Sequence, residues 1–389
     1  MTRKDFDVTI TRRHLLGAAA GSLLLQACAA PRTTSTAGKT IMTVQADAYN
    51  TVRLFASSGF APDTTRIDLA LNRLAQAGLS VSNTAAAYRR AQRFAGTDAE
   101  RAADLQDVAS GKVPTPQMLL GVRGGYGAAR ILPMIDWTSL GARMRERGTL
   151  LFGFSDVCAI QLALLAQGKM SSFAGPMLYS EFGKPDPSVL TMQHFVDTVS
   201  AKPRTLNVNS FIARPFRTEG IIWGGNLSVL VSLIGTPYFP AIDGGILFLE
   251  DVGEQPYRID RMLHQLYLSG CLKKQQAIIL GNFRTENAVD IYDAAYDLPM
   301  VLADLRRLTG IPIFTDFPFG HIRDKASFPL GVRCRLETDD GGYRVSFDDY
   351  PTMHANQLNL QSLVPSVFSL DIFEAEGSAA SDAAGNNEE

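Results

Sequence analysis

The fold is decided by the stretch Leu150-Leu-Phe-Gly-Phe-Ser155-Asp-Val157. Its apolar residues predict a buried strand over residues 149–154, and the polar residues that follow lead into a helix predicted over 157–167. Upstream, another strand is followed by the loop Gly124-Gly-Tyr-Gly127 and a predicted helix over 128–135. This repeated order of strand, loop and helix is typical of a parallel, doubly wound sheet, whose working edge lies at the carboxyl ends of its strands.

The pattern changes after Lys202-Pro203. A strand predicted over 245–250 precedes a helix predicted over 257–268, and Asp339-Asp-Gly-Gly342 predicts a hairpin between two late strands. The length of 389 residues also exceeds what one core usually holds. We therefore predict two domains, joined near residues 200–210.

The composition excludes several classes of function. The formal net charge is -2, and no basic stripe is present that would follow a phosphate backbone, so nucleic acid is not an expected partner. No HExxH motif, paired cysteines or clustered acids indicate a metal, and we expect neither a metal nor an organic cofactor. The four cysteines show no CxxC spacing and stand at Cys28, Cys158, Cys271 and Cys334.

The first 28 residues predict an export signal rather than part of the fold. Thr11-Arg-Arg-His-Leu-Leu-Gly17 resembles a twin-arginine signal, and the apolar run over 15–27 is too short to span a bilayer. The run ends in Leu25-Gln-Ala-Cys28, which resembles the lipobox of bacterial lipoproteins, in which the cysteine is acylated. The alternative is a short N-terminal anchor helix that is never cleaved. Ala29 after the cysteine favours the outer over the inner membrane, with the protein on the periplasmic face.

The segments that flank the body have little apolar content. Residues 29–46 predict a flexible tether and residues 366–389 a disordered acidic tail. The predicted domains cover 47–203, with the candidate nucleophile, and 204–365. If Cys28 is lipidated, three thiols remain, which allow at most one disulfide.

Ser155 stands at the predicted junction of strand and helix, where its hydroxyl would be exposed beside free backbone N–H groups. That position supplies a nucleophile and half of an oxyanion hole. The elbow motif G-x-S-x-G is only half present, because Gly153 fits while Val157 replaces the second glycine. The competing interpretation is a helix N-cap, the usual role of a serine before a helix.

A serine nucleophile needs a base, and histidine is the usual one. His321 follows a strand, in the apolar turn Phe317-Pro-Phe-Gly-His321, whereas His194 and His264 lie within predicted helices and His354 in a late loop. His321 is therefore the best candidate, although a lone loop histidine is more often not catalytic.

The third member must be a carboxylate that orients the base. Glu250 ends the apolar strand Leu247-Phe-Leu-Glu250, with Asp251 and Glu254 as alternatives. Glu250 could instead pair with a basic residue such as Arg258 or Arg261. The glycine loop lacks the pattern of a phosphate-binding loop, and its N–H groups are better suited to a substrate carbonyl.

These segments together closely resemble the LD-carboxypeptidase (muramoyltetrapeptide carboxypeptidase) family of serine peptidases, which also includes the immunity peptidases that cleave microcin C. The resemblance spans about residues 52–345. In chain order, its pieces are Ala56-Ser-Ser-Gly59, Arg123-Gly-Gly-Tyr-Gly-Ala-Ala-Arg-Ile-Leu-Pro133, Gly153-Phe-Ser-Asp156, Gly175-Pro176, Gly224-Gly-Asn-Leu227, Gly235-Thr-Pro237, Leu247-Phe-Leu-Glu-Asp251, Glu254-Gln-Pro-Tyr-Arg-Ile-Asp-Arg261 and Phe319-Gly-His321.

The resemblance implies an α/β fold: a flavodoxin- or Rossmann-like parallel-sheet domain, then a mixed α/β domain of the swivelling β/β/α type, with the active site in the cleft between them. It places the nucleophile at Ser155, the charge-relay glutamate at Glu250 and the base at His321. The oxyanion hole would use backbone N–H groups of Asp156 and of the glycine loop, at Gly125. The resemblance also implies a homodimer.

Asn226 could face the same cleft, which is a weaker expectation. Two features depart from the family pattern: Ala174 replaces a frequent histidine before Gly-Pro, and the best-known members carry no export signal. The expected reaction is release of the terminal D-Ala from muramoyl tetrapeptide through an acyl-enzyme. The alternatives are an immunity-type peptidase that cleaves microcin C-like conjugates and a lipoprotein that only binds peptidoglycan.

Overall fold

The computed structural model describes residues 49–211, 214–285 and 288–365. The predicted signal, Cys28, the tether and the acidic tail lie outside these residues. Within the described part of the chain, no helix has the length and apolar character needed to cross a membrane.

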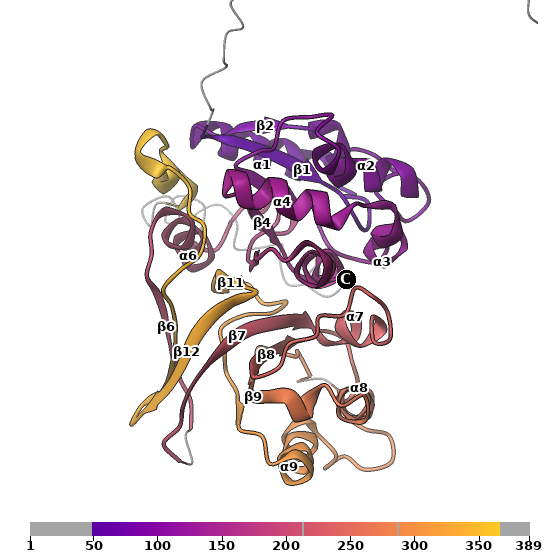
Figure 1. Ribbon diagram of the computed structural model, residues 1–389, viewed down its shortest axis with the longest axis vertical. Coiled ribbons are helices and arrows are strands. Elements are labelled where there is room, and N and C mark those ends of the chain that lie inside the picture. The colour runs from indigo at the N-terminus through magenta and orange to yellow at the C-terminus, as the bar shows by residue number, and fades with distance from the viewer. Residues whose placement is uncertain (1–48, 212–213, 286–287, 366–389) are drawn as a thin grey trace, which may run out of the picture. The chain divides into compact units, whose positions relative to one another are not determined.

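The first sheet has the strand order β11-β5-β4-β3-β1-β2 (Figure 1). Strands β1 to β5 run parallel, as predicted, and only β11 is antiparallel to its neighbour. The strands are β1 (Thr51–Phe55), β2 (Ser80–Ser82), β3 (Met118–Gly121), β4 (Leu150–Gly153), β5 (Ser172–Ala174) and β11 (Phe328–Leu330). Strands β3 and β4 are buried along their whole length, as parallel strands covered on both faces usually are.

Helices accompany this sheet in the connections between its strands, as a doubly wound order requires. They are α1 (Thr64–Gln76), α2 (Asp98–Ala109), α3 (Ala128–Ile131), α4 (Trp137–Arg147) and α5 (Cys158–Ala163), while α6 (Val189–Ser200) follows β5 and leads to the second sheet. The helix predicted over 128–135 is shorter than expected: it ends at Ile131 and continues as the 3-10 turn η2 (Leu132–Met134). Pro133 explains the break, because its ring lacks an N–H and clashes with the preceding turn.

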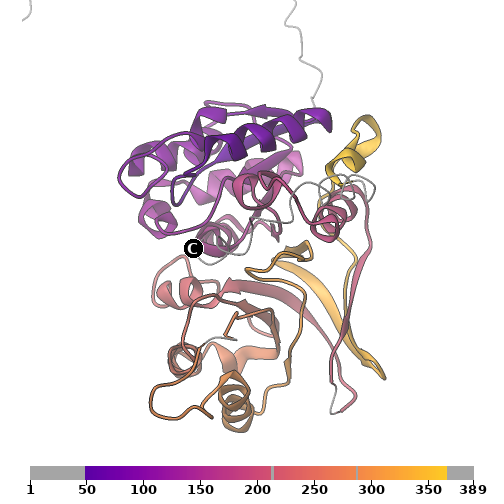
Figure 2. The same ribbon diagram turned by 180° about the vertical axis from the view of Figure 1, so that it is seen from behind.

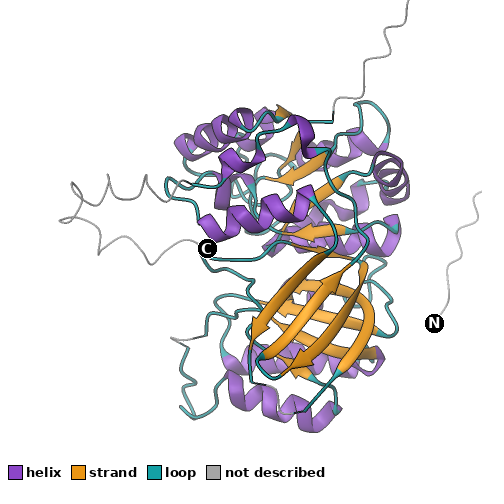
Figure 3. Ribbon diagram, turned by 90° about the vertical axis from the view of Figure 1, so that its left-hand side faces the viewer, coloured by secondary structure: helices purple, strands orange, loops and turns teal. Residues whose placement is uncertain are grey.

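The second sheet has the order β10-β9-β8-β7-β12-β13-β6. Strands β7 to β10 are parallel, while β12, β13 and β6 add antiparallel pairs, so this sheet is mixed (Figure 3). The strands are β6 (Arg204–Asn209), β7 (Arg217–Asn226), β8 (Gly245–Glu250), β9 (Gln275–Leu280), β10 (Ile313–Phe314), β12 (Val332–Asp339) and β13 (Gly342–Phe347). The pairing of Asp339 with Gly342 confirms the predicted hairpin.

Helices α7 (Leu227–Ser232), α8 (Pro256–Leu268) and α9 (Leu298–Thr309) accompany the parallel part of the second sheet. After β13 the chain returns to the first half of the molecule, where η8 (Leu360–Leu363) packs on α1 and α6, as Figure 2 shows from behind. Strand β11 also crosses, because it belongs to the first sheet although it follows β10 in the sequence. The boundary predicted between residues 203 and 204 stays a prediction.

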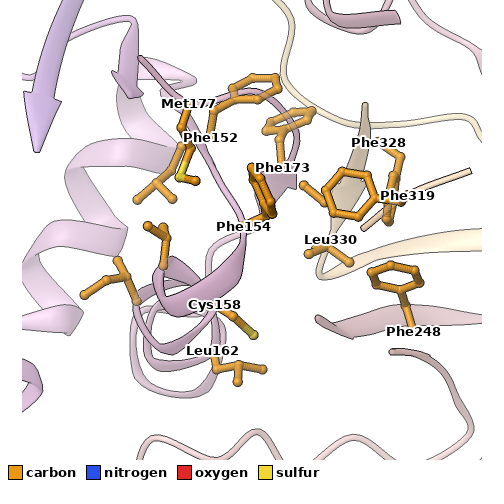
Figure 4. Packing of buried hydrophobic residues seen from close by; sticks show 14 of the residues in the cluster. Phe152, Phe154, Cys158, Leu162, Phe173, Met177, Phe248, Phe319, Phe328 and Leu330 are labelled. Carbon is orange, nitrogen blue, oxygen red and sulfur yellow. The ribbon is translucent and has the colours of Figure 1, made fainter. Parts of the chain in front are cut away.

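Aromatic side chains from both sheets meet next to the candidate site (Figure 4). The ring of Phe154, directly before Ser155, lies 5.7 Å from that of Phe319, two residues before His321. Phe319 in turn packs edge-on against Phe248 and Phe328, with centroids 5.8 and 5.2 Å away. Such edge-to-face pairs add to the burial of apolar area. The packing therefore holds the segments before Ser155 and before His321 against each other.

Candidate active site

Ser155 lies at the turn between β4 and α5, in the 3-10 turn η3 (Ser155–Val157). Its φ of 60° places a non-glycine residue in the left-handed region, which is uncommon and often marks a functional turn. The turn resembles the nucleophile elbow of other hydrolases, in which a strained backbone exposes the hydroxyl at the end of a buried strand. The N-cap positions of η3 and α5 are occupied by Phe154 and Val157, so the geometry does not favour the N-cap interpretation of Ser155.

The side chains of His321 and Glu250 complete a chain of hydrogen bonds that begins at Ser155. His321 Nε2 lies 3.0 Å from Ser155 Oγ, and His321 Nδ1 lies 2.9 Å from Glu250 Oε2. Glu250 ends β8 and its side chain is 1 % exposed, while that of His321 is 21 % exposed. The structure thus brings together the three candidate residues of the sequence analysis. His321 is 71 residues from Glu250 and 166 residues from Ser155 along the chain. The geometry is that of a nucleophile, a base and a group that orients the base.

The other candidate bases and acids have different partners. His194 contacts Arg204, His264 contacts Asp260, and the ring of His354 lies 4.2 Å from that of Tyr49. Burial and the neighbouring Arg204 lower the pKa of His194. The alternative acids also have other roles, since Glu254 pairs with Arg258 and Asp251 accepts the backbone N–H of Ser228 at the start of α7.

The glycine loop borders the nucleophile at Gly124. A Cβ atom at this position would lie 2.6 Å from Ser155 Oγ, so only glycine leaves room for the hydroxyl. Gly125, the predicted oxyanion residue, comes next in the chain with a φ of 106°, and it faces Gly59. Gly59 N donates to the Gly124 carbonyl over 3.1 Å, which ties the Ala56-Ser-Ser-Gly59 loop to the glycine loop. Gly124 belongs to the family motif over residues 123–133, but its spacing did not show that this glycine, and not a neighbouring one, would lie against the nucleophile.

Asp156 connects the nucleophile turn to the same loop through its side chain. Its Oδ2 accepts the N–H of Ala128 over 2.8 Å. Burial raises the pKa of Asp156, and hydrogen bonds from Ser58 and Ala128 act in the opposite direction. The sequence predicted a role for the backbone N–H of Asp156. The structure adds that its buried carboxyl anchors the end of the glycine loop.

Asn226 is placed at the end of β7, beside Glu250 on β8. Its 4 % exposed side chain acts as the N-cap of α7, because Oδ1 accepts from Val229 N and from the Ser228 hydroxyl. Its Nδ2 donates to Asp251 Oδ1 over 3.0 Å. Asn226 is therefore near the triad, but the contacts in the described structure give it a structural role that the sequence did not predict.

Asp251 gives a prediction for the pH dependence of stability. Burial and the adjacent Glu250 raise its pKa to about 6, from a usual value of 3.8, while its hydrogen bonds oppose this shift. Between these two values the folded protein binds more protons than the unfolded chain, so stability falls as pH rises from about 4 to about 6. A shift of two units corresponds to about 3 kcal/mol.

We expect Asp251→Asn, which cannot titrate, to lack this slope. The measurement is the unfolding free energy of parent and variant in urea at several pH values from 3.5 to 8, with the difference plotted against pH. The variant should gain on the parent between pH 4 and 6 and keep a constant difference above pH 7. Parallel curves over the whole range would show that Asp251 does not titrate in this window.

Ser155 is half-buried on a strained turn, and it is hydrogen-bonded to a histidine that a buried glutamate orients. This arrangement defines a serine hydrolase on an α/β scaffold. The comparisons with known proteins give the family. Models of the LD-carboxypeptidase N-terminal and C-terminal domains match residues 52–175 and 219–336. This chain belongs to the LD-carboxypeptidase family of serine peptidases.

Three relatives illustrate the similarity. The chain is 37% identical over 254 residues to a putative carboxypeptidase of Streptomyces coelicolor, covering 64% of this chain and 77% of that protein. It is 32% identical over 282 residues to a probable murein peptide carboxypeptidase of Bacillus subtilis, covering 71% and 86%. The crystal structure of muramoyltetrapeptide carboxypeptidase from Oxalobacter formigenes superposes with a TM-score of 0.71 at 38% identity, covering 78% of this chain and 100% of that one. These matches confirm the predicted fold class and the assignment to the serine carboxypeptidases.

Proposed function

We propose that the protein hydrolyses the bond between an L-configured centre and the terminal D-Ala of muramoyl tetrapeptide. The observation that carries the proposal is the Ser155–His321–Glu250 arrangement, with distances of 3.0 and 2.9 Å. The muramoyl tetrapeptide is taken from the related structure of Oxalobacter formigenes, whose name states that substrate. No step of the reaction depends on a metal or an organic cofactor.

In this proposal each proton has a route that the distances support. His321 Nε2 takes the proton of Ser155 Oγ while this oxygen forms a bond with the scissile carbonyl carbon, and Glu250 stabilises the imidazolium. When the C–N bond breaks, the imidazolium gives the proton to the departing amine, and D-Ala leaves. Water, deprotonated by the same imidazole, then attacks the ester carbonyl carbon. As the C–O bond to Ser155 breaks, the imidazolium returns its proton to Ser155 Oγ, and the tripeptide acid leaves. Protons and electrons balance over the two half-reactions.

The negative charge of the tetrahedral intermediate needs donors close to Ser155. We place the oxyanion at the N–H groups of Asp156 and Gly125, as the family resemblance implies. Support comes from Gly124, whose missing side chain lets the glycine loop approach Ser155 Oγ, and from the hydrogen bonds of Asp156 and Gly59 that hold this loop. Donors that are fixed before the reaction need no reorganisation when the charge develops.

The direct test is mass spectrometry of the disaccharide tetrapeptide after incubation with signal-free protein. The expected product has lost one D-Ala, and the Ser155→Ala variant should leave the substrate intact. If neither protein changes the tetrapeptide, the family assignment stands and this substrate is wrong. A microcin C-like peptide–nucleotide conjugate would then be the next substrate to test, and a peptidoglycan-binding protein without activity the last interpretation.

We also propose that the protein is exported by the twin-arginine route and anchored through an acylated Cys28 on the periplasmic face, with the outer membrane preferred. The support is the sequence of the first 28 residues alone. Cys28→Ser should move the protein from the membrane fraction of cells to the soluble periplasmic fraction, while Cys158→Ser, which alters a buried thiol, should not. Membrane retention of the Cys28→Ser protein would contradict lipidation. The homodimer stays a prediction.

A further inference from the structure

A hollow of about 530 Å³ lies against the loop that carries the candidate base and is lined by Pro318 and Ile322 of that loop. It is formed at the carboxyl ends of β9 and β10, the edge at which parallel sheets usually bind ligands. Its wall includes Arg284, Asp316 and Ile322, and Ile322 is the neighbour of His321 in the chain. The hollow therefore borders the segment that carries His321, the base that would protonate the leaving group.

Arg284 is the positive group on this wall. Its Nη1 donates to the carbonyl oxygen of His321 over 3.3 Å, and its side chain is exposed. Among the residues that the structure describes, Arg284 forms no ion pair. The guanidinium therefore has further N–H donors that face neither a carboxylate nor the protein interior.

The backbone holds Arg284 in place through a specific turn. Its φ of 47° is left-handed, and its N–H donates to Asn282 Oδ1 over 2.8 Å. Asn282 N donates to the Phe319 carbonyl over 2.8 Å. A Cβ atom at Gly320 would lie 2.8 Å from the Asn282 carbonyl, so the two segments pack closely. Arg284 is thus fixed relative to the loop that carries His321.

Several other cations in the region of the site have acidic partners. Lys325, for example, is 2 % exposed and pairs with Glu181 over 2.7 Å. The same holds for Arg258 with Glu254, Arg323 with Asp186, and Arg130 with Asp98. Arg284 differs from these four cations because it contacts His321 and has no acidic partner among the described residues.

We infer that Arg284 binds the free α-carboxylate of the residue that leaves, and thereby restricts cleavage to the last peptide bond. This inference rests on the proposed function. The departing nitrogen must lie next to His321 Nε2 in order to receive its proton, and the carboxyl carbon of a terminal residue is only two bonds from that nitrogen. A guanidinium bound to the His321 backbone is well placed to meet this carboxylate, and it matches carboxylate geometry with two parallel N–H groups. The hollow gives the departing residue room.

The test compares two substrates that differ only in this group: a tetrapeptide that ends in D-Ala and one that ends in D-alaninamide. Charge-assisted hydrogen bonds contribute enough for the parent to prefer the acid by about 10- to 100-fold in kcat/KM. Arg284→Gln should lose that preference, with kcat/KM for the acid falling to the value for the amide and the amide value unchanged. Arg284→Lys, which keeps the charge but not the paired donors, should recover part of the preference.

The matched control is Arg307→Gln, because Arg307 is an exposed arginine on α9 whose loss changes the net charge equally. It should keep the parent's preference for the acid. An equal loss on both substrates in Arg284→Gln would show that Arg284 only supports His321, and an unchanged ratio would show that another group binds the carboxylate. Either result overturns the inference while the proposed function stands. A parent that cleaves the last peptide bond of neither substrate overturns both.

Discussion

Replacing Ser155 with alanine is expected to lower kcat for D-Ala release by about 10⁶-fold, which is the size of loss seen when a serine hydrolase loses its nucleophile. The reason is that no other oxygen lies 3.0 Å from His321 Nε2 in the described structure. The residual rate would come from the oxyanion donors and from substrate binding. The measurement is single-turnover release of D-Ala from the disaccharide tetrapeptide.

The fold of this variant should be intact, because alanine adopts the left-handed φ of 60° at about the same cost as serine. Ser232→Ala, which removes an exposed hydroxyl on α7, is the matched control and should retain full activity. The double variant Ser155→Ala/His321→Ala should be about as slow as Ser155→Ala alone, since the two residues act as a unit. A Ser155→Ala enzyme within tenfold of the parent would disprove the triad.

Replacing Glu250 with glutamine is expected to lower kcat by about 10⁴-fold, with a smaller change in KM. Glu250 Oε2 accepts a hydrogen bond from His321 Nδ1–H over 2.9 Å, and this fixes the tautomer whose Nε2 can accept from Ser155. A glutamine amide can donate to Nδ1 instead, which favours the tautomer that carries its proton on Nε2. In that tautomer the base cannot take the serine proton.

The control for this variant is Glu254→Gln, which removes a carboxylate four residues away that pairs with Arg258 instead of His321. It separates the loss of the triad contact from the loss of one negative charge near the site. Circular dichroism and the melting temperature should show that Glu250→Gln is folded, because the substitution keeps the shape of the side chain. If kcat falls less than tenfold, the imidazole is oriented by another group.

Much of the site could be predicted because each triad residue occupies a position that the local pattern marks. Ser155 follows a strand of apolar residues, Glu250 ends another, and His321 follows an aromatic turn. Local patterns gave each of these residues a structural alternative, and the ordered family motifs decided between them. The helix predicted over 157–167 shows the limit of pattern reading: it is a 3-10 turn, then α5, then the π-helical segment Leu164–Gly168.

Asn226 and Asp251 show why side-chain roles could not be read in the same way. The sequence assigned Asn226 to the cleft and made Asp251 an alternative to Glu250. In the structure both cap α7 and bond to each other over 3.0 Å. Successive side chains at the end of a strand point to opposite sides. Glu250 therefore faces the base, while Asp251, one residue later, caps a helix.

The sequence by itself determined the parallel sheet, the serine at its edge and the family, since these depend on the order of strands, loops and motifs along the chain. Only the tertiary structure showed that Asp251 and Asn226 cap α7, that Gly124 makes room for the nucleophile, and that Arg284 contacts the backbone carbonyl of His321. These relations depend on how Phe154 packs against Phe319 and on how Asn282 lies against Gly320. The physical reason is that dense packing fixes distances between residues far apart in the chain, and periodicity carries no information about such distances.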